Sequence, residues 1–259
     1  MRFEDVANAV QGVPFMSPAH GRRVYDHVRE TRPERILELG SGYGVGAAYM
    51  AAALHENGSG RLTTVDYSIA SFDPRPETLL TEVGLAEHVE VVRDFSTYTW
   101  FLKERIEERS DPDGNCEPVY DFVYLDGSKN WTVDGLAVFL IEKLLRPGGW
   151  LLMDDLHWRY ADSEWAHLFD GNGRPFGPLS PREREQPHLR AVFDLIVMQH
   201  PAFNEFRIED DWFGWARKLP GQPRRFELRS SRPLAEVIAT RLRRAVRRHR
   251  RVRPHSTVT

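Results

Sequence analysis

Ile36-Leu-Glu-Leu-Gly40-Ser-Gly42-Tyr-Gly44-Val-Gly46 is the stretch that decides the fold of this chain. It begins as a short apolar run, of the kind that forms a buried parallel strand. Four glycines follow at every second position, and an alanine-rich helical pattern then runs from Ala47 to Leu54. A strand that ends in glycines and resumes as a helix presents bare backbone N–H groups to a ligand. The alternative is a glycine-rich turn that binds no ligand.

Length and composition indicate one globular domain with an appendage. The chain has 259 residues, of which 28% are charged and 41% are hydrophobic, as in ordinary soluble proteins. No apolar run approaches the ~18 residues that a membrane-spanning helix needs, and the N-terminus lacks the profile of a signal peptide. We therefore expect a cytoplasmic protein without a membrane span. The single cysteine, Cys116, excludes an internal disulfide and a cysteine-rich zinc site.

Charge is distributed unevenly along the chain. Residues 220–259 hold twelve arginines against Glu227 and Glu236, a balance of +10, so the rest of the chain carries −13. Residues 234–250 show a helical period with apolar residues on one face and arginines on the other. Such a helix suits an anionic membrane, a nucleic acid or an acidic surface, and the alternative is a terminal helix that only adds solubility. The acidic body argues against a broad nucleic-acid footprint.

Strand and helix patterns alternate five times after the first residues. The predicted strands lie at 35–39, 61–66, 89–94, 120–126 and 150–155. Such alternation predicts a parallel sheet with right-handed crossovers. Two more strand patterns, at 205–209 and 212–218, predict an antiparallel hairpin at one edge. We therefore predict an α/β fold with a Rossmann-like, doubly wound, seven-stranded and mostly parallel sheet that ends in a C-terminal antiparallel hairpin.

Composition also predicts where the chain divides. Residues 1–32 form a helical approach or cap segment, 33–219 form the main domain, and 220–259 form a basic linker and helix. Within the main domain, residues 159–188 are rich in proline and glycine and too long for a simple connector. This segment is a candidate lid, and a plain surface loop is the alternative.

Acidic residues stand at the ends of four predicted strands. They are Asp66, Asp94, Asp126 and the adjacent pair Asp154 and Asp155. In an open α/β sheet the ligand binds beyond the carboxyl ends of the strands, where an acid after the second strand accepts hydrogen bonds from ribose hydroxyls. Carboxylates gathered at one edge repel one another unless something positive lies among them. Asp126, Asp154 and Asp155 therefore form a candidate set of oxygen ligands for a Mg²⁺-like ion.

Three stretches of the sequence resemble known methyltransferases. The glycine turn, with Glu38 two residues before its first glycine, resembles the first motif of class I S-adenosylmethionine (SAM) methyltransferases. Leu125-Asp-Gly-Ser-Lys129-Asn-Trp resembles the D-x-x-K-x-x-aromatic segment of catechol and caffeoyl-coenzyme A O-methyltransferases. Leu152-Met-Asp-Asp-Leu-His-Trp158 resembles the segment after strand five of the same group. The resemblance covers about residues 12–158.

The resemblance implies a role for each matching residue. SAM would contact Glu38, Gly40, Ser41, Gly42, Gly44, Asp66, Asp94, Ser96 and Asp126. Asp126, Asp154 and Asp155 would bind a divalent metal such as Mg²⁺, and Lys129 would be the general base. Asp155 replaces the asparagine of the family, and residues 159–188 match nothing in it, so the acceptor pocket is unassigned. The later half is similar instead to O-methyltransferases of natural-product pathways.

The sequence thus predicts a SAM-dependent methyltransferase that methylates a hydroxyl of a small molecule with the help of a divalent metal. The first alternative is a metal-free class I O- or N-methyltransferase in which His157 or an aspartate is the base, and His20 is a further candidate base. A second alternative is a non-catalytic module that binds an anionic partner through the basic tail. A dehydrogenase is disfavoured because its glycine spacing is usually G-x-G-x-x-G, and an aminopropyltransferase because Lys129 does not suit an amine pocket. A homodimer is left open.

Overall fold

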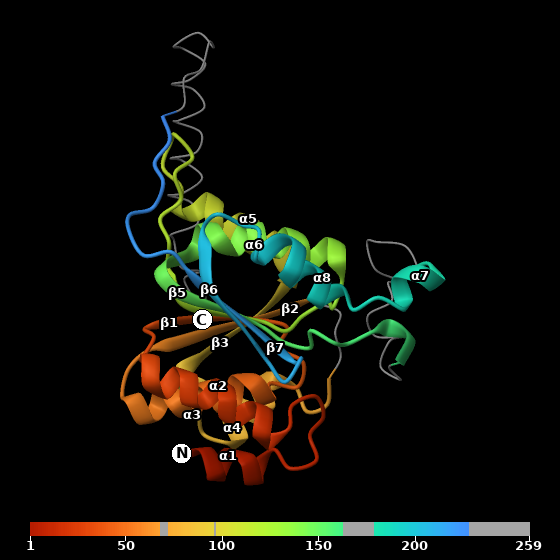
Figure 1. The fold of residues 1–259 in the computed structure, drawn as a ribbon. Coiled ribbons are helices and arrows are strands. Elements are labelled where there is room, and N and C mark those ends of the chain that lie inside the picture. Colours follow the sequence, from red (N-terminus) through yellow and green to blue (C-terminus); the bar gives the residue numbers. More distant parts are fainter. Residues whose placement is uncertain (68–71, 96, 163–178, 228–259) are drawn as a thin grey trace, which may run out of the picture.

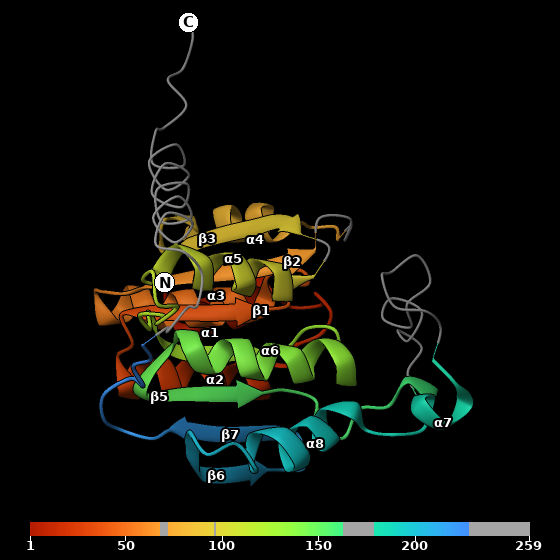
Figure 2. The same ribbon diagram turned by 90° about the horizontal axis from the view of Figure 1, so that it is seen from above.

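A computed structural model describes residues 1–67, 72–95, 97–162 and 179–227 of the chain. In these residues seven strands form one sheet with the order β3-β2-β1-β4-β5-β7-β6 (Figures 1 and 2). β1 to β5 are parallel, and β7 is antiparallel to both β5 and β6. The strands are β1 (Arg35–Leu39), β2 (Arg61–Tyr67), β3 (Val89–Phe95), β4 (Tyr120–Leu125), β5 (Leu145–Met153), β6 (Phe203–Glu209) and β7 (Phe213–Lys218). The predicted sheet and its hairpin are confirmed.

Helices cover both faces of the sheet, so the fold is doubly wound (Figure 1). On one face lie α1 (Phe3–Ala9), α2 (Pro18–Thr31), α3 (Val45–Asn57) and α4 (Pro76–Glu82). On the other lie α5 (Tyr98–Arg109), α6 (Trp131–Leu144) and α8 (His188–Val192), which continues into η4 (Phe193–Val197). The short elements are η1 (Ala86–His88), η2 (Tyr160–Asp162) and α7 (Pro181–Arg184). α7 stands beyond the carboxyl ends of the parallel strands (Figure 2).

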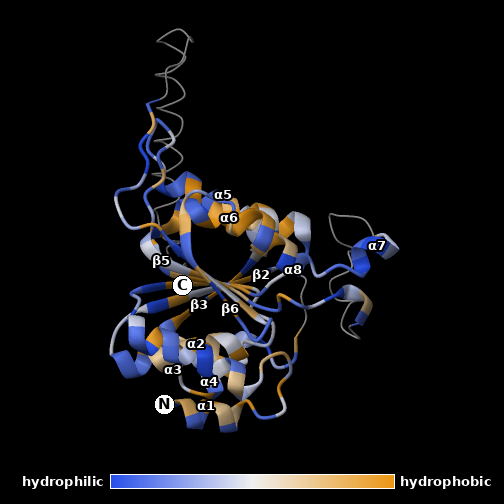
Figure 3. Ribbon diagram, viewed as in Figure 1, coloured by the Kyte–Doolittle hydropathy of each residue, from blue (hydrophilic) through white to orange (hydrophobic). Residues whose placement is uncertain are grey.

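Alternating side chains of the central strands supply both cores. In β4, Phe122 and Tyr124 face the α3 side, whereas Val123 and Leu125 face the α6 side. This period of two is what a pleated strand requires when both of its faces are covered. Hydrophobic residues accordingly concentrate on the central strands and on α6 (Figure 3).

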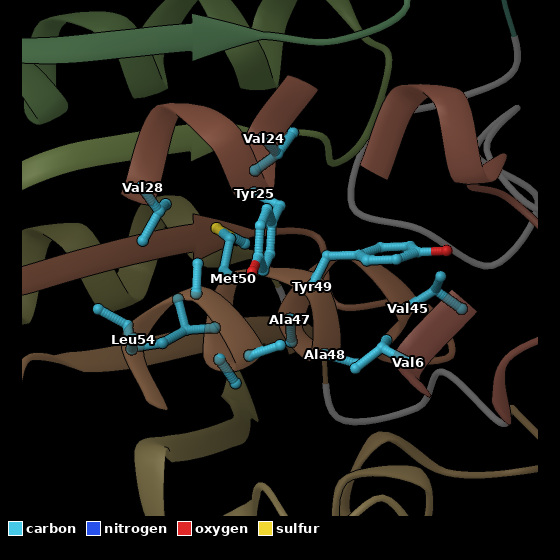
Figure 4. Packing of buried hydrophobic residues seen from close by; sticks show 14 of the residues in the cluster. Val6, Val24, Tyr25, Val28, Val45, Ala47, Ala48, Tyr49, Met50 and Leu54 are labelled. Atoms are coloured by element: carbon cyan, nitrogen blue, oxygen red, sulfur yellow. The ribbon is translucent and has the colours of Figure 1, made fainter. Parts of the chain in front are cut away.

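Helix α3, which follows the glycine turn, is buried on nearly all sides. Val45 and residues 47–54 are each at most 3% exposed, and Gly46 is buried as well. Tyr49 of this helix stacks on Phe3 of α1 at 4.9 Å between ring centroids, and its ring fills the space left by the missing side chain of Gly21 in α2. Figure 4 shows this packing of α1, α2 and α3. Residues 1–32 therefore share the core of the main domain, although their boundary as a segment stays a prediction.

Local contacts explain where α2 and β5 begin. The side chain of Ser17 caps α2 by accepting a hydrogen bond from the N–H of His20 at 3.2 Å. The prediction that the fifth strand begins at Trp150 was wrong: β5 begins at Leu145, which pairs with Tyr120. The strand passes through Pro147-Gly-Gly because its register shifts between Tyr120 and Phe122, which accommodates residues that normally break a strand.

Some predicted features lie outside the described residues. These are the basic helix at 234–250 and residues 163–178 of the candidate lid. In the part of the chain that the structure describes, no helix is both long and apolar enough to cross a membrane.

Candidate functional site

Glycines bring the turn after β1 against the neighbouring strand ends. Gly40 has φ +103°, and a side chain there would overlap the backbone carbonyl of Asp126. Gly44 has φ +90° and is the residue before α3, and a Cβ on it would lie 2.9 Å from Pro76 Cα. Only glycine adopts these conformations without strain and allows so close an approach. The turn therefore lies directly against the carboxyl end of β4.

Asp66, at the end of β2, is bonded to this turn. Its Oδ2 accepts hydrogen bonds from the backbone N–H groups of Ser41 at 3.1 Å and Gly42 at 3.0 Å. Its Oδ1 accepts one from the N–H of Tyr67 at 2.8 Å. Burial raises the pKa of Asp66, and these backbone hydrogen bonds oppose that rise. The structure thus brings Asp66 to the glycine turn, as the sequence predicted.

Glu38 lies beneath the turn and is 1% exposed. Its carboxyl accepts a hydrogen bond from the Thr64 hydroxyl, which lies 2.6 Å from the hydroxyl of Ser41. A Cβ on Gly46 would lie 2.5 Å from Glu38 Oε1, so the first turn of α3 has room for Glu38 only because this residue is glycine. Burial raises the pKa of Glu38 well above its ordinary value. Glu38 and Ser41 therefore join β1, β2 and the turn through one buried network.

The three predicted metal ligands lie together with Lys129. The N–H of Asp126 donates to Leu39 O at 2.9 Å, and that of Asp154 donates to Leu125 O at 3.1 Å, so both aspartates continue the ladder past the strand ends. Lys129 Nζ ion-pairs with Asp126 and, at 2.6 Å, with Asp155 Oδ2. The Lys129 side chain is only 7% exposed. The cation among these carboxylates in the structure is thus a lysine ammonium.

The protonation of this group differs from the sequence-based expectation for Lys129. Burial lowers the pKa of Lys129, but Asp126, Asp155 and Asp154 together raise it well above its ordinary value. A general base has to be deprotonated before it accepts a proton, whereas the carboxylates that face Lys129 favour its protonated ammonium. Burial, together with the charges of Asp126 and Asp155, raises the pKa of Asp154.

The three carboxylates are not arranged around one common point in this structure. Asp154 Oδ2 accepts the Tyr124 hydroxyl, and its Oδ1 accepts the N–H of Asp155 at 2.7 Å. Among the described residues, the one trio of His, Cys, Asp or Glu side chains whose ligand atoms all lie within 4.8 Å of each other is elsewhere. The donor set is three hard oxygens, which suits Mg²⁺ chemically. For all three to meet an ion, Lys129 must withdraw and Asp154 must turn.

Backbone strain marks the same place. Lys129 and Asp155 have φ +55° and +56°, a left-handed conformation that costs non-glycine residues about 1 kcal/mol or more. Such strain persists where the surroundings hold it, and it clusters at functional sites. Lys129 and Asp155, which form an ion pair between the loops after β4 and β5, are therefore both held in uncommon backbone conformations.

Sequence analysis missed the residues that hold the Lys129 loop. The buried carboxylate of Asp134 accepts the hydroxyl of Tyr98 and, at 2.6 Å, the N–H of Asn130. The Tyr98 hydroxyl accepts the N–H of Ser128 at 3.0 Å. Asn130 caps α6 by accepting the N–H groups of the next turn. An asparagine just before a helical pattern was the one signal in the sequence, while the Tyr98 contact joins residues far apart in it.

The candidate lid is attached to the same loop on both sides. Before residues 163–178, the Tyr160 hydroxyl donates to Ser128 O at 3.0 Å. After them, His188 Nδ1 accepts the N–H of Trp131 at 3.1 Å. The described ends of segment 159–188 therefore contact the residues on either side of Lys129.

Two histidines lie on the Asp155 side of the site. His157 is exposed and packs on the ring of Trp212 at 4.5 Å between centroids, and His20 packs on the same ring at 4.2 Å. Burial lowers the pKa of His20, and the charge of Asp155 opposes this. Both predicted alternative bases are thus near Asp155. Asp94 is at the end of β3, whereas its side chain and Ser96 lie outside the described residues.

Comparison with known proteins identifies this arrangement. Residues 37–156, from β1 to just beyond β5, match the family model described as a methyltransferase domain. These residues of the chain therefore match a methyltransferase domain. The matched residues of this domain include the glycine turn and all of the strand-end aspartates. No curated protein matches the chain in sequence.

Solved structures show the same fold at low identity. The O-methyltransferase TomG of Streptomyces achromogenes, involved in tomaymycin synthesis and solved with SAM, has 19% identity over 84% of this chain and 89% of its own, with a TM-score of 0.55. A Bacillus cereus O-methyltransferase solved with S-adenosylhomocysteine (SAH) has 21% identity over 83% and 90%, also at 0.55. A putative caffeoyl-CoA O-methyltransferase of Staphylococcus aureus has 14% identity over 84% and 92%, at 0.58.

Proposed function

We propose that this methyltransferase moves the methyl group of SAM to a hydroxyl oxygen of a small-molecule acceptor. The observation that carries the proposal is the buried group of Lys129, Asp126 and Asp155, placed against the glycine turn through the contact of Gly40 with Asp126. The methyl group of SAM is already activated, so the enzyme has to position an acceptor and remove its proton. An acid–base group beside the cofactor turn is suited to both tasks.

SAM would lie along residues 40–44. Asp66 would accept a hydrogen bond from a ribose hydroxyl with Oδ1, which receives the N–H of Tyr67 and has a second acceptor site. The adenine would lie beside Asp94 or Ser96. Glu38 would act from beneath, by holding Ser41 and the turn in place.

Asp126, Asp154 and Asp155 would hold a divalent cation such as Mg²⁺. When bound there, the cation would lower the pKa of an acceptor hydroxyl. Lys129 cannot serve as a base while three carboxylates raise its pKa. If the bound cation neutralised these carboxylates, the cause of the raised pKa of Lys129 would be removed. Lys129 would then be free to take the acceptor proton.

Chelation and one substitution test this assignment together. With a chelator, turnover should stop, and Mg²⁺ or Mn²⁺ should restore it. Lys129→Ala should lower kcat by about 10²–10⁴-fold, the usual contribution of a general base, while SAM affinity changes little. A matched control is Lys103→Ala, because Lys103 lies on the exposed face of α5 and ion-pairs only with Glu107 among the described groups. Full activity in chelator would contradict the metal-dependent form.

A metal-free O- or N-methyltransferase is the second candidate. It is favoured by the positions of His157 and His20 on Trp212, next to Asp155. In that form Lys129 would stay an ammonium that orients the acceptor oxygen, and His157 would take the proton. Loss of activity in His157→Gln together with full activity in chelator would select this candidate.

The basic tail is proposed to take no part in the chemistry. Asn115 accepts the N–H of Phe226 and donates to Phe226 O at 2.8 Å, which attaches the start of the tail to the loop before β4. That loop is at the opposite end of β4 from Asp126. We therefore propose that the small-molecule acceptor binds and reacts without contact with the tail. A natural-product acceptor, a cytoplasmic location and a homodimer stay predictions.

A further inference from the structure

We propose that His55, Glu87 and His88 form a second metal site, which binds a borderline transition-metal ion such as Zn²⁺. His55 lies in the last turn of α3, and the other two residues lie in η1, immediately before β3. The site would join the far end of the cofactor-binding helix to the turn that leads into the edge strand. It is independent of the proposed acceptor chemistry.

Two of the distances between ligand atoms are close to those around a tetrahedral ion. His55 Nδ1 lies 3.1 Å from His88 Nε2, and His88 Nε2 lies 3.6 Å from Glu87 Oε1. Two ligands at the usual zinc bond lengths of about 2.0–2.2 Å stand about 3.3–3.5 Å apart in a tetrahedron. The three atoms all lie within 4.8 Å of one another, and they form the one such trio among the described residues.

The donor set selects the kind of ion. Imidazole nitrogens suit Zn²⁺, Ni²⁺ and Cu²⁺, whereas Mg²⁺ prefers oxygen ligands. The site at His55, with two nitrogens and one carboxylate oxygen, should therefore prefer a different ion from the group of three carboxylates at Asp126. His55 and Glu87 are exposed and His88 is half-buried, so water can supply the fourth ligand.

The two imidazoles already contact each other at the place where an ion would bind. Without an ion, the two imidazoles share one N–H···N hydrogen bond, and a metal ion would take the place of that proton between them.

The expected role of the ion is to stabilise the fold. His55 lies ten residues after Val45, the first residue of α3, so about 15 Å of helix at 1.5 Å per residue separates it from the glycine turn. An ion at this distance touches neither the cofactor turn nor the acceptor. An ion that binds only the folded state raises the free energy of unfolding. The increase grows with the logarithm of the ratio of ion concentration to Kd.

Thermal unfolding with added metal tests the proposal on the full chain. In a background of excess Mg²⁺, which keeps the acceptor site occupied, free Zn²⁺ at about ten times its Kd should raise the Tm of the wild type by about 3–6 °C, with one Zn²⁺ bound per chain by calorimetry. His55→Ala and His88→Ala should each abolish the shift and the tight binding. His200→Ala, a histidine outside the site, and Asp154→Ala, in the acceptor site, should both retain them.

Two results would overturn the proposal. One is an equal Zn²⁺-induced shift in His55→Ala and in the wild type, which would place the ion elsewhere. The other is the absence of stoichiometric Zn²⁺ binding to the wild type, which would leave only a hydrogen-bonded histidine pair. If a variant is too unstable for the thermal assay, Glu87→Gln provides a milder change that should weaken Zn²⁺ binding at least several-fold.

Discussion

His27 makes the stability of this protein depend on pH. The ring lies on α2 among Phe122 and Trp215, each 4.7 Å away between centroids, and Trp150 at 5.9 Å. Its Nε2 is buried and has no hydrogen-bond partner among the residues that the structure describes. Burial, aided by the charge of Arg207, lowers the pKa of His27 from 6.5 to about 4. The folded protein therefore holds this imidazole neutral at a pH where the unfolded chain protonates it.

The sign and size of the effect follow from proton linkage. Because the folded pKa is below the unfolded one, the contribution of His27 is full above pH 6.5 and is lost as pH falls toward 4. Each unit of difference corresponds to 1.36 kcal/mol, so the loss is about 2–3 kcal/mol in the free energy of unfolding. His27→Phe keeps a ring among rings but cannot take up a proton.

Urea unfolding at several pH values measures this contribution. The free energy of unfolding of His27→Phe minus that of the wild type should grow by about 2–3 kcal/mol between pH 7.5 and 4. Other acid-titrating groups are common to both proteins and cancel in the difference. The pH 7.5 value separates any packing cost of the larger ring from the protonation effect. A difference that is the same at every pH would refute the reasoning.

Three further outcomes are expected. Gly46→Ala should lower the free energy of unfolding by about 1–3 kcal/mol, because its Cβ would press on buried Glu38; urea unfolding equal to that of the wild type would show that Glu38 can move away. Asp154→Ala should lower turnover as chelation does, without loss of SAM binding, and activity that still responds to Mg²⁺ as in the wild type would count against Asp154 as a ligand. Truncation at Pro220 should leave turnover on a saturating soluble acceptor intact, and a folded but inactive truncated protein would give the tail a catalytic role.

The sheet could be predicted because its signals are local in the sequence. Short apolar runs, the glycine turn and the acids at strand ends each lie within a few residues of one another. The start of β5 at Leu145 could not be predicted, because Pro147-Gly-Gly usually ends a strand and only its pairing with Tyr120 carries it through. The packing of α1 on α3 through Phe3 and Tyr49 is likewise a contact between distant residues.

The site could be predicted in its residue types but not in its pairing. Parallel strands bring Asp126, Asp154 and Asp155 to one edge, and the sequence is sufficient for that inference. The position of the Lys129 ammonium between two of them depends on left-handed backbone conformations that no local pattern indicates. Tyr160 and His188 contact the Lys129 loop from segment 159–188. Because this segment resembles nothing in the family, the sequence did not indicate these contacts.

Calorimetric titration with SAH tests the central claim most directly, because it needs neither the acceptor nor the metal. The claim predicts one SAH per chain for the wild type. It also predicts that Asp66→Ala weakens binding by about 1.5–3 kcal/mol, since a charged acceptor of the ribose hydroxyls is lost. The control variant Asp73→Ala, at an exposed acidic residue outside the proposed contacts, should bind as the wild type does. Absence of SAH binding to the folded wild type, or equal affinity in Asp66→Ala, would contradict the account.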